Sequence, residues 1–158
     1  MDRVNQIWKH PLYQTELHKL QLLEADREFC RHTPEHFLDV ARLAYIRAIE
    51  ENYSVSKELI YCTALLHDIG RARQYEDGTP HDEAGAVIAE QILKELGFSP
   101  EEIQAIVSAI RGHRAETNQT ILGQLIYRAD KKSRNCFSCK AEPECYWSSA
   151  KKNMTIQY

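Results

Sequence analysis

The sequence lacks any apolar run near the ~20 residues that a membrane-spanning helix needs. Residues 1–8 contain no apolar signal-peptide core, so we expect a cytoplasmic protein without a membrane partner. A glycine-rich phosphate loop and a strand-like alternation of apolar and polar residues are also missing, as are internal repeats and low-complexity stretches. These absences argue against a P-loop site and a β-rich fold.

Charge of one sign is not in large excess, because 20 Lys and Arg residues face 23 Asp and Glu residues for a net charge of -3. Such a chain has no global attraction to a polyanion, and polymeric DNA or RNA is not an expected partner. Cysteines number five, an odd count that predicts thiols or metal ligands rather than a disulfide framework. The 158 residues fit one domain with its own core.

Apolar residues recur with helical spacing in residues 103–110, and again in 37–48, 59–66 and 122–129. Ser99-Pro100-Glu101-Glu102 predicts a helix start with a capping box. Gly97 predicts the end of a preceding helix over about 82–96. A leading helix is expected near residues 3–28. The pattern therefore predicts an all-α bundle.

An adjacent histidine and aspartate, His67 and Asp68, follow an apolar run and precede Ile69-Gly70. A neutral imidazole and a carboxylate can hold one divalent cation, and the glycine is expected to let the chain turn away and leave coordination positions open. His36 lies upstream and Asp130 downstream. This set predicts a metal site.

Two further histidines lie at expected helix ends. Thr33-Pro34 and Thr79-Pro80 each look like an N-cap followed by a first-turn proline, which places His36 and His81 in opening turns. His113 follows Gly112 at the end of the helix that contains residues 103–110. A simple helix-end role is the alternative to metal binding for His81 and His113.

The order of His36, His67-Asp68 and Asp130 resembles the HD-domain metal-dependent phosphohydrolases. The resemblance implies an HD-domain helical bundle and a first metal held by these four residues. His81 and His113 match the extra histidines of binuclear members such as HD-GYP phosphodiesterases and dinucleoside-polyphosphate hydrolases, which implies that Asp68 bridges two ions. We expect a single HD domain over residues 1–158, with 131–158 as a cysteine-containing C-terminal segment.

The chain departs from these relatives at two places. Arg114 stands where the HD-GYP pattern has a second histidine, and Arg71 replaces a characteristic lysine but keeps its positive charge. Cationic side chains near the expected site can neutralise charge on phosphoryl oxygens. We expect Asp68 and Arg71 to act in catalysis, and Arg71, Arg114 and Lys131 to bind substrate phosphate, with Arg73 a further candidate by proximity. A plain surface charge is the alternative for Arg71 and Arg114.

Four imidazoles and two carboxylates suit divalent Fe, Mn, Co, Ni or Zn. Two such ions about 3.5 to 4 Å apart can hold a hydroxide and clamp a phosphoryl group. We therefore expect a metal-dependent hydrolase of a small phosphate ester or anhydride, with a nucleotide or nucleotide derivative as substrate. The alternatives are a di-iron HD-type oxygenase and a non-catalytic nucleotide-binding regulatory protein, and a homodimer is left open. His10, His18 and His32 lie outside the motif and are expected to be capped or solvent-facing.

A second constellation lies near the C-terminus, where Cys136, Cys139 and Cys145 form a C-x2-C-x5-C arrangement. The first two have the spacing of a zinc knuckle, and a structural zinc site normally has a fourth ligand. Cys30 is the candidate because it lies six residues before His36, as Cys136 lies six after Asp130. An Fe-S cluster and free loop thiols are the alternatives. Cys62 lies on an apolar stripe and is expected in the core.

Overall fold

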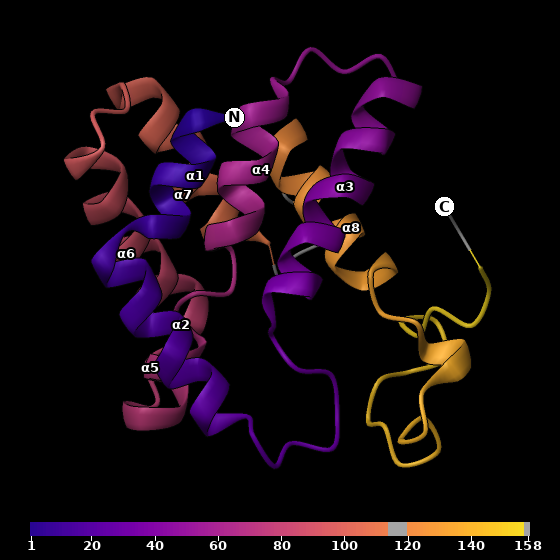
Figure 1. Cartoon of the computed structure of the whole chain (residues 1–158). Helices are drawn as coiled ribbons and strands as arrows, with labels where there is room; N and C mark the ends of the chain where they lie inside the picture. Colours follow the sequence, from indigo (N-terminus) through magenta and orange to yellow (C-terminus); the bar gives the residue numbers. More distant parts are fainter. Residues whose placement is uncertain (114–119, 157–158) are drawn as a thin grey trace.

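The computed structural model describes residues 1–113 and 120–156 of the chain. These residues contain helices and no β-strand, which confirms the all-α prediction. In chain order the helices are α1 (Asp2–Lys9), α2 (Pro11–Leu23), α3 (Pro34–Glu50), α4 (Lys57–Leu66), α5 (Arg71–Asp77), α6 (His81–Glu95), α7 (Pro100–Gly112), α8 (Ile121–Lys132) and the 3-10 helix η1 (Cys136–Ser138) (Figure 1). Over the described parts of the chain, no helix is both long and apolar enough to cross a membrane.

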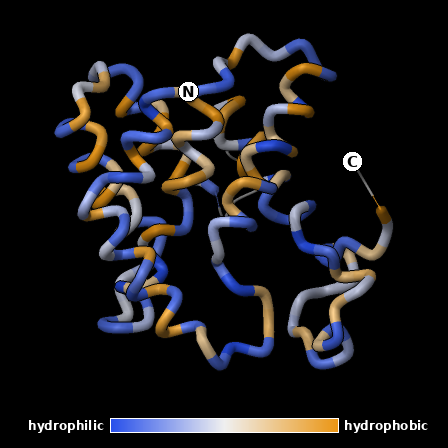
Figure 2. Tube along the Cα trace, in the orientation of Figure 1, coloured by the Kyte–Doolittle hydropathy of each residue, from blue (hydrophilic) through white to orange (hydrophobic). Residues whose placement is uncertain are grey.

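Two clusters of buried apolar side chains meet along α4. One joins α1, α2, α6 and α7 to Leu65 and Leu66 of α4, and the other packs α3 and α8 against Ile60 and Ala64 of the same helix. Figure 2 shows orange stretches recurring between blue ones along the helices, as expected for helices that bury one face. The end of α4, which leads into His67, is therefore held where the two clusters meet.

The turn between α6 and α7 has the predicted structure. The Ser99 hydroxyl accepts a hydrogen bond from the Glu102 N–H at 3.3 Å, and the Glu102 carboxylate accepts one from the Ser99 N–H at 3.0 Å. Gly97 adopts φ +73°, in the left-handed region that favours glycine. The sequence prediction of this turn is confirmed, and it sets α7 against α6.

The predicted leading helix over residues 3–28 is wrong, because the chain breaks between α1 and α2. His10 is extended, with φ -65° and ψ 130°, and proline disfavours helical backbone in the residue before it. Pro11 then begins α2, and the His10 imidazole accepts a hydrogen bond from the Leu12 N–H at 3.3 Å. His10 is thus a buried N-cap of α2 rather than a solvent-facing residue.

Gly70 serves a close backbone contact rather than a turn. Its φ of -77° is open to any residue, so the backbone conformation alone does not require a glycine here. A Cβ at this position would lie 2.2 Å from the backbone oxygen of His81 and 2.3 Å from the backbone nitrogen of Gly85. Gly70 therefore allows the start of α5 to pack directly on the start of α6.

The two predicted threonine caps have different outcomes. The Thr33 hydroxyl accepts a hydrogen bond from the His36 N–H at 3.4 Å at the start of α3, as predicted. In α6 the N-cap residue is Pro80 and no side chain caps the helix, so the expected Thr79 cap is wrong. His36 and His81 nevertheless lie in opening turns, as expected.

Candidate metal centre

Four predicted ligands converge from three helix ends and form a first ligand group. His36 lies in the opening turn of α3, His67 and Asp68 directly follow α4, and Asp130 lies in the last turn of α8. All four are buried, and one ligand atom from each lies within 4.8 Å of the others. His36 Nε2 is 3.4 Å from Asp130 Oδ1, and His67 Nε2 is 3.1 Å from Asp68 Oδ2.

A second ligand group consists of Asp68, His81 and His113. The Nε2 atoms of His81 and His113 lie 3.3 Å and 3.5 Å from Asp68 Oδ1, and 3.3 Å from each other. Asp68 thus turns Oδ2 toward the first group and Oδ1 toward the second. This is the arrangement that a bridging carboxylate requires.

Hydrogen bonds on the far side of the rings fix the imidazole tautomers. Nδ1 of His67 donates to the Ala64 carbonyl at 2.7 Å, and Nδ1 of His113 donates to the Ile110 carbonyl at 2.5 Å. A carbonyl only accepts, so Nδ1 carries a hydrogen in both rings, and the neutral form of each ring turns its Nε2 lone pair toward the carboxylates. His81 is held through Nδ1 by Gln74 Oε1 at 2.7 Å, and His36 by Ser133 Oγ at 3.1 Å. Such outer contacts are typical of metal-binding histidines.

The donor set fits a divalent transition metal. His67 Nε2 is buried without a hydrogen-bond partner in the described chain, and the facing nitrogens of His81 and His113 suit a shared cation. Burial opposes ionisation of Asp68, but His67, His32 and Arg71 hold the pKa of this carboxyl well below its usual range. Two buried anionic carboxylates and several imidazoles can therefore hold metal ions here.

The imidazoles of the first group differ in their pKa. Burial lowers the pKa of His36 to about 4, so this ring is neutral and ready to ligate near pH 7. Burial also acts to lower the pKa of His67, but the carboxylates of Asp68 and Asp130 outweigh burial and raise this pKa to about 9. A bound cation would replace the His67 proton between these carboxylates.

His32 also belongs to this centre, although we expected it to be capped or solvent-facing. It is buried, its Nε2 lies 3.4 Å from Asp68 Oδ2, and its Nδ1 lies 2.6 Å from Glu24 Oε1. Glu24 is itself buried and accepts a hydrogen bond from the Tyr75 hydroxyl at 2.8 Å. His32 stands in the loop between α2 and α3, where no helical period or motif spacing points to it.

Three cationic side chains contact the centre. Arg71 Nε donates to Asp68 Oδ1 at 3.0 Å, Lys131 Nζ donates to Asp130 Oδ2, and Arg134 Nη2 lies 2.9 Å from His36 Nε2. Arg134 was not among the sequence candidates.

Another arginine candidate, Arg73, is not part of this contact set. Arg73 pairs with Glu16 at 3.0 Å, which accounts for its charge without the centre. Arg114 lies outside the described residues.

A cleft of about 60 Å³ opens beside the centre. Its lining combines the ligand Asp130, His32, cations and aromatic rings: Arg27, Phe29, Cys30, His32, Arg71, Asp130, Lys131, Arg134, Cys145, Tyr146 and Trp147. The aromatic wall comes from the C-terminal segment and from the loop before α3. No sequence motif predicts this wall.

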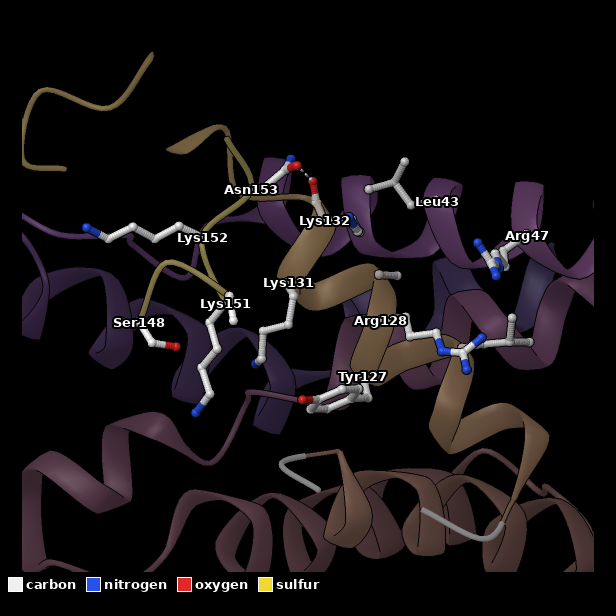
Figure 3. A pocket seen from close by; sticks show the side chains of 13 residues that line it. Leu43, Arg47, Tyr127, Arg128, Lys131, Lys132, Ser148, Lys151, Lys152 and Asn153 are labelled. Carbon is white, nitrogen blue, oxygen red and sulfur yellow. Dashed lines mark hydrogen bonds between the residues drawn. The ribbon is translucent and has the colours of Figure 1, made fainter. Parts of the chain in front are cut away.

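A larger cavity of about 490 Å³ lies between α3, α8 and the tail 148–153 (Figure 3). None of the proposed metal ligands lines it. Its cationic lining residues are Arg47, Arg128, Lys131, Lys132, Lys151 and Lys152. Lys131 lines both spaces, and its ammonium lies 5.4 Å from the Tyr127 ring and 5.3 Å from the Trp147 ring. The cavity and the cleft are therefore neighbours on either side of Lys131.

Comparison with known proteins identifies the family. The HD domain family matches residues 33–135, and the chain belongs to it. The match spans the first ligand group from His36 to Asp130. A predicted HD superfamily hydrolase from an uncultured Thermotogales bacterium has the same fold, with a TM-score of 0.67, 23% identity, and 92% of this chain and 82% of that chain covered.

Sequence relatives add two kinds of similarity. An uncharacterized protein of Clostridium beijerinckii is 46% identical over the full length of both chains. Ribonuclease Y of Geotalea uraniireducens is 30% identical over 121 residues, which cover 77% of this chain and 22% of that protein. The chain thus spans about a fifth of the length of this ribonuclease.

Proposed function

We propose that this chain is a metal-dependent phosphohydrolase of a small phosphate ester or anhydride, with a nucleotide or nucleotide derivative as substrate. One observation carries the proposal: two buried ligand groups share Asp68 and lie beside the cations Arg71, Lys131 and Arg134. Divalent ions bound there supply a water of lowered pKa and Lewis-acid polarisation of the phosphoryl oxygens. Membership of the HD domain family supports the same chemistry.

The three cations bind the phosphoryl group. They face Asp68, Asp130 and His36, so they surround the place where a phosphoryl group would approach the ligand groups. Charge grows on the phosphoryl oxygens in the transition state, and fixed cations in a site of low water content stabilise it. Arg71 is the principal one because its guanidinium contacts the shared carboxylate.

His32 is a positioning residue in this proposal. One ring nitrogen faces Glu24 and the other faces Asp68 Oδ2, so the ring is held between two carboxylates. It fixes the orientation of the Asp68 carboxylate, on which both ligand groups depend. Replacing His32 would loosen that carboxylate without removing a member of either group.

The two cavities suggest where the two parts of the substrate would bind. The cleft of about 60 Å³ has room for a phosphoryl group, whereas the cavity of about 490 Å³ is in the size range of small-molecule sites. Lys131 lies between them, flanked by Tyr127 and Trp147. An anionic substrate with an aromatic base could place its phosphoryl group in the cleft and extend past Lys131.

Cleavage of RNA is the second candidate function. The ribonuclease Y relative and the six cations that line the larger cavity favour it. A short RNA strand would follow such a basic lining through its phosphates. Both substrates would react at the same metal centre through a phosphoryl group. They differ in the part that would occupy the larger cavity.

The test is a substrate panel with protein purified without oxygen and loaded with Mn, Fe, Co or Ni. The panel contains nucleoside mono-, di- and triphosphates, dinucleoside polyphosphates, cyclic nucleotides and an RNA oligonucleotide. We expect phosphate or nucleotide release that Arg71→Ala reduces. Arg42→Ala, at an exposed arginine of α3 that pairs with Asp39, is the matched control and should leave activity unchanged. Metal-loaded protein that consumes oxygen with substrate and releases no phosphate product would overturn the proposal.

A further inference from the structure

Four of the five cysteines gather at one place outside the candidate metal centre. Cys30 comes from the loop before α3, and Cys136, Cys139 and Cys145 come from the segment after α8. All four line a single small cavity. Cys62 is separate and fully buried in the core, as predicted.

Contacts between the two segments keep these cysteines together. Arg134 Nη1 donates to the backbone oxygen of Arg31 at 2.7 Å, and the rings of Phe29 and Tyr146 meet edge to face at 6.3 Å. On the other side, Asn153 donates to the backbone oxygen of Lys132 at 3.0 Å, the dashed contact in Figure 3. The C-terminal segment thus lies against both the loop before α3 and the end of α8.

The segment that carries three of the thiols is built from the 3-10 helix η1 and the linked turns that follow it. The Cys139 N–H donates to the Cys136 oxygen at 3.2 Å, the Glu142 N–H to the Cys139 oxygen at 3.2 Å, and the Cys145 N–H to the Glu142 oxygen at 3.1 Å. Each turn begins or ends at a cysteine. Cys136 is buried, the other two are partly buried, and all three line the cavity.

The size of the cavity suits a single ion. Its volume is about 10 Å³, close to that of one water-sized sphere. The sulfur atoms are not among the groups whose ligand atoms all lie within 4.8 Å of one another. Binding one ion at the Zn–S distance of about 2.3 Å therefore requires χ1 rotation of the cysteines.

The charge around the cavity suits four thiolates. One divalent ion and four thiolates leave a net negative charge. Lys152 lines the cavity, where its ammonium donates to the Glu142 backbone oxygen at 2.9 Å, and the positive charge of Arg134 acts on Cys30. Arg134 can offset part of the surplus, whereas the Lys152 ammonium also pairs with the Glu142 carboxylate at 2.6 Å.

We propose that Cys30, Cys136, Cys139 and Cys145 bind one structural zinc ion, which fixes the C-terminal segment as a wall of the cleft. Cys30 and Cys145 line both the cysteine cavity and the cleft, and Tyr146 and Trp147 follow directly in the chain. The zinc site stands on the cysteine geometry alone. Only its effect on the cleft rests on the proposed phosphohydrolase function.

Cobalt(II) is the probe for the site, because thiolate-bound cobalt gives near-ultraviolet charge-transfer absorption that a histidine and carboxylate site does not. We expect full-length protein to bind one cobalt with this absorption, and one zinc to abolish it. Cys139→Ser should lose the absorption and one equivalent of zinc while circular dichroism shows retained helix. Cys139→His should recover zinc binding, because histidine also ligates zinc. Cys62→Ala is the matched control and should keep both the cobalt absorption and the bound zinc.

Several results would overturn the zinc site: no thiolate–cobalt absorption in the wild type, four freely reactive thiols in zinc-supplemented protein, or brown protein containing acid-labile sulfide. The effect on the cleft has its own measurement. With an active substrate, Cys139→Ser should raise KM several-fold and change kcat little. An unchanged KM in zinc-free Cys139→Ser would refute the role of the C-terminal segment as a wall of the cleft, but not the zinc site. The cobalt absorption and the zinc content can both be measured without any hydrolytic activity.

Discussion

The substitution Gly70→Ala should damage this protein out of proportion to one added methyl group. The new Cβ would lie 2.2 Å from the His81 backbone oxygen, whereas unstrained carbon–oxygen contacts begin near 3.3 Å, so the backbones must part by about 1 Å. No side-chain rotation can relieve a contact between backbone atoms. Overpacking of this kind costs about 1–3 kcal/mol, which corresponds to a Tm lowered by roughly 2–12 °C in a domain of this size.

The same displacement should split the second ligand group. His81 Nε2 is 3.3 Å from Asp68 Oδ1, and a shift of α6 by about 1 Å takes the imidazole out of the reach of a common ion. We expect metal analysis of Gly70→Ala to show loss of one ion equivalent while the group containing His36 keeps its own.

Gly85→Ala is the matched control, since it lies on the other side of the same contact. Its Cβ would be 3.4 Å from the Gly70 nitrogen and 3.5 Å from Ile110 Cγ2, which are ordinary contact distances. Alanine also stabilises a helix interior by about 0.5–1 kcal/mol relative to glycine, so its Tm should stay or rise. Thermal unfolding and metal content of the two variants decide the matter: a Gly70→Ala protein with wild-type Tm and metal content would refute the packing argument.

Three further predictions concern the site and its support. Asp68→Ala should remove most bound metal and lower hydrolysis more than about 100-fold, because both ligand groups lose their shared member; retained metal and turnover would contradict this assignment. Arg71→Ala should lower kcat by about 100-fold with metal content intact, and Arg71→Lys should recover part of the loss, whereas equal rates in all three proteins would make Arg71 a surface charge. Burial favours protonated Glu24, but hydrogen bonds from His32 and Tyr75 outweigh it and lower the pKa of Glu24 from 4.5 to about 2. A lowered carboxyl pKa stabilises the fold above pH 4.5, and this stabilisation is lost as the pH falls toward 2. Urea unfolding of Glu24→Gln should therefore show a free energy of unfolding lower by up to about 3 kcal/mol at neutral pH, with a weaker dependence on pH between 4.5 and 2. Parallel plots of unfolding free energy against pH for the two proteins would refute this prediction.

Local chemistry made much of the fold predictable. The capping box at Ser99 and the left-handed Gly97 depend on neighbouring residues alone, and so does the proline-led start of α3 at Thr33. The leading helix was mispredicted because apolar spacing continues through His10 and Pro11, while the backbone restriction that proline imposes on His10 breaks the helix there.

The motif histidines were predictable as a set because their order along the chain resembles a known family. His32 and Arg134 were not, since they reach the centre from loops whose paths depend on contacts far away in the sequence. Arg134, for example, is held by the backbone of Arg31. Gly70 shows a related limit: its place beside the motif was visible, but the approach of α6 that requires it appears only in three dimensions.

The ligand groups draw their members from the ends of helices, and this has a consequence for folding. An ion that joins the start of α3, the end of α4 and the end of α8 acts as a cross-link between distant parts of the chain, much as a disulfide does. Such a link removes more chain entropy as the loops that it closes grow longer. Metal loading should therefore slow amide hydrogen exchange most at these helix ends, and less in the middle of α4, which the two apolar clusters already hold.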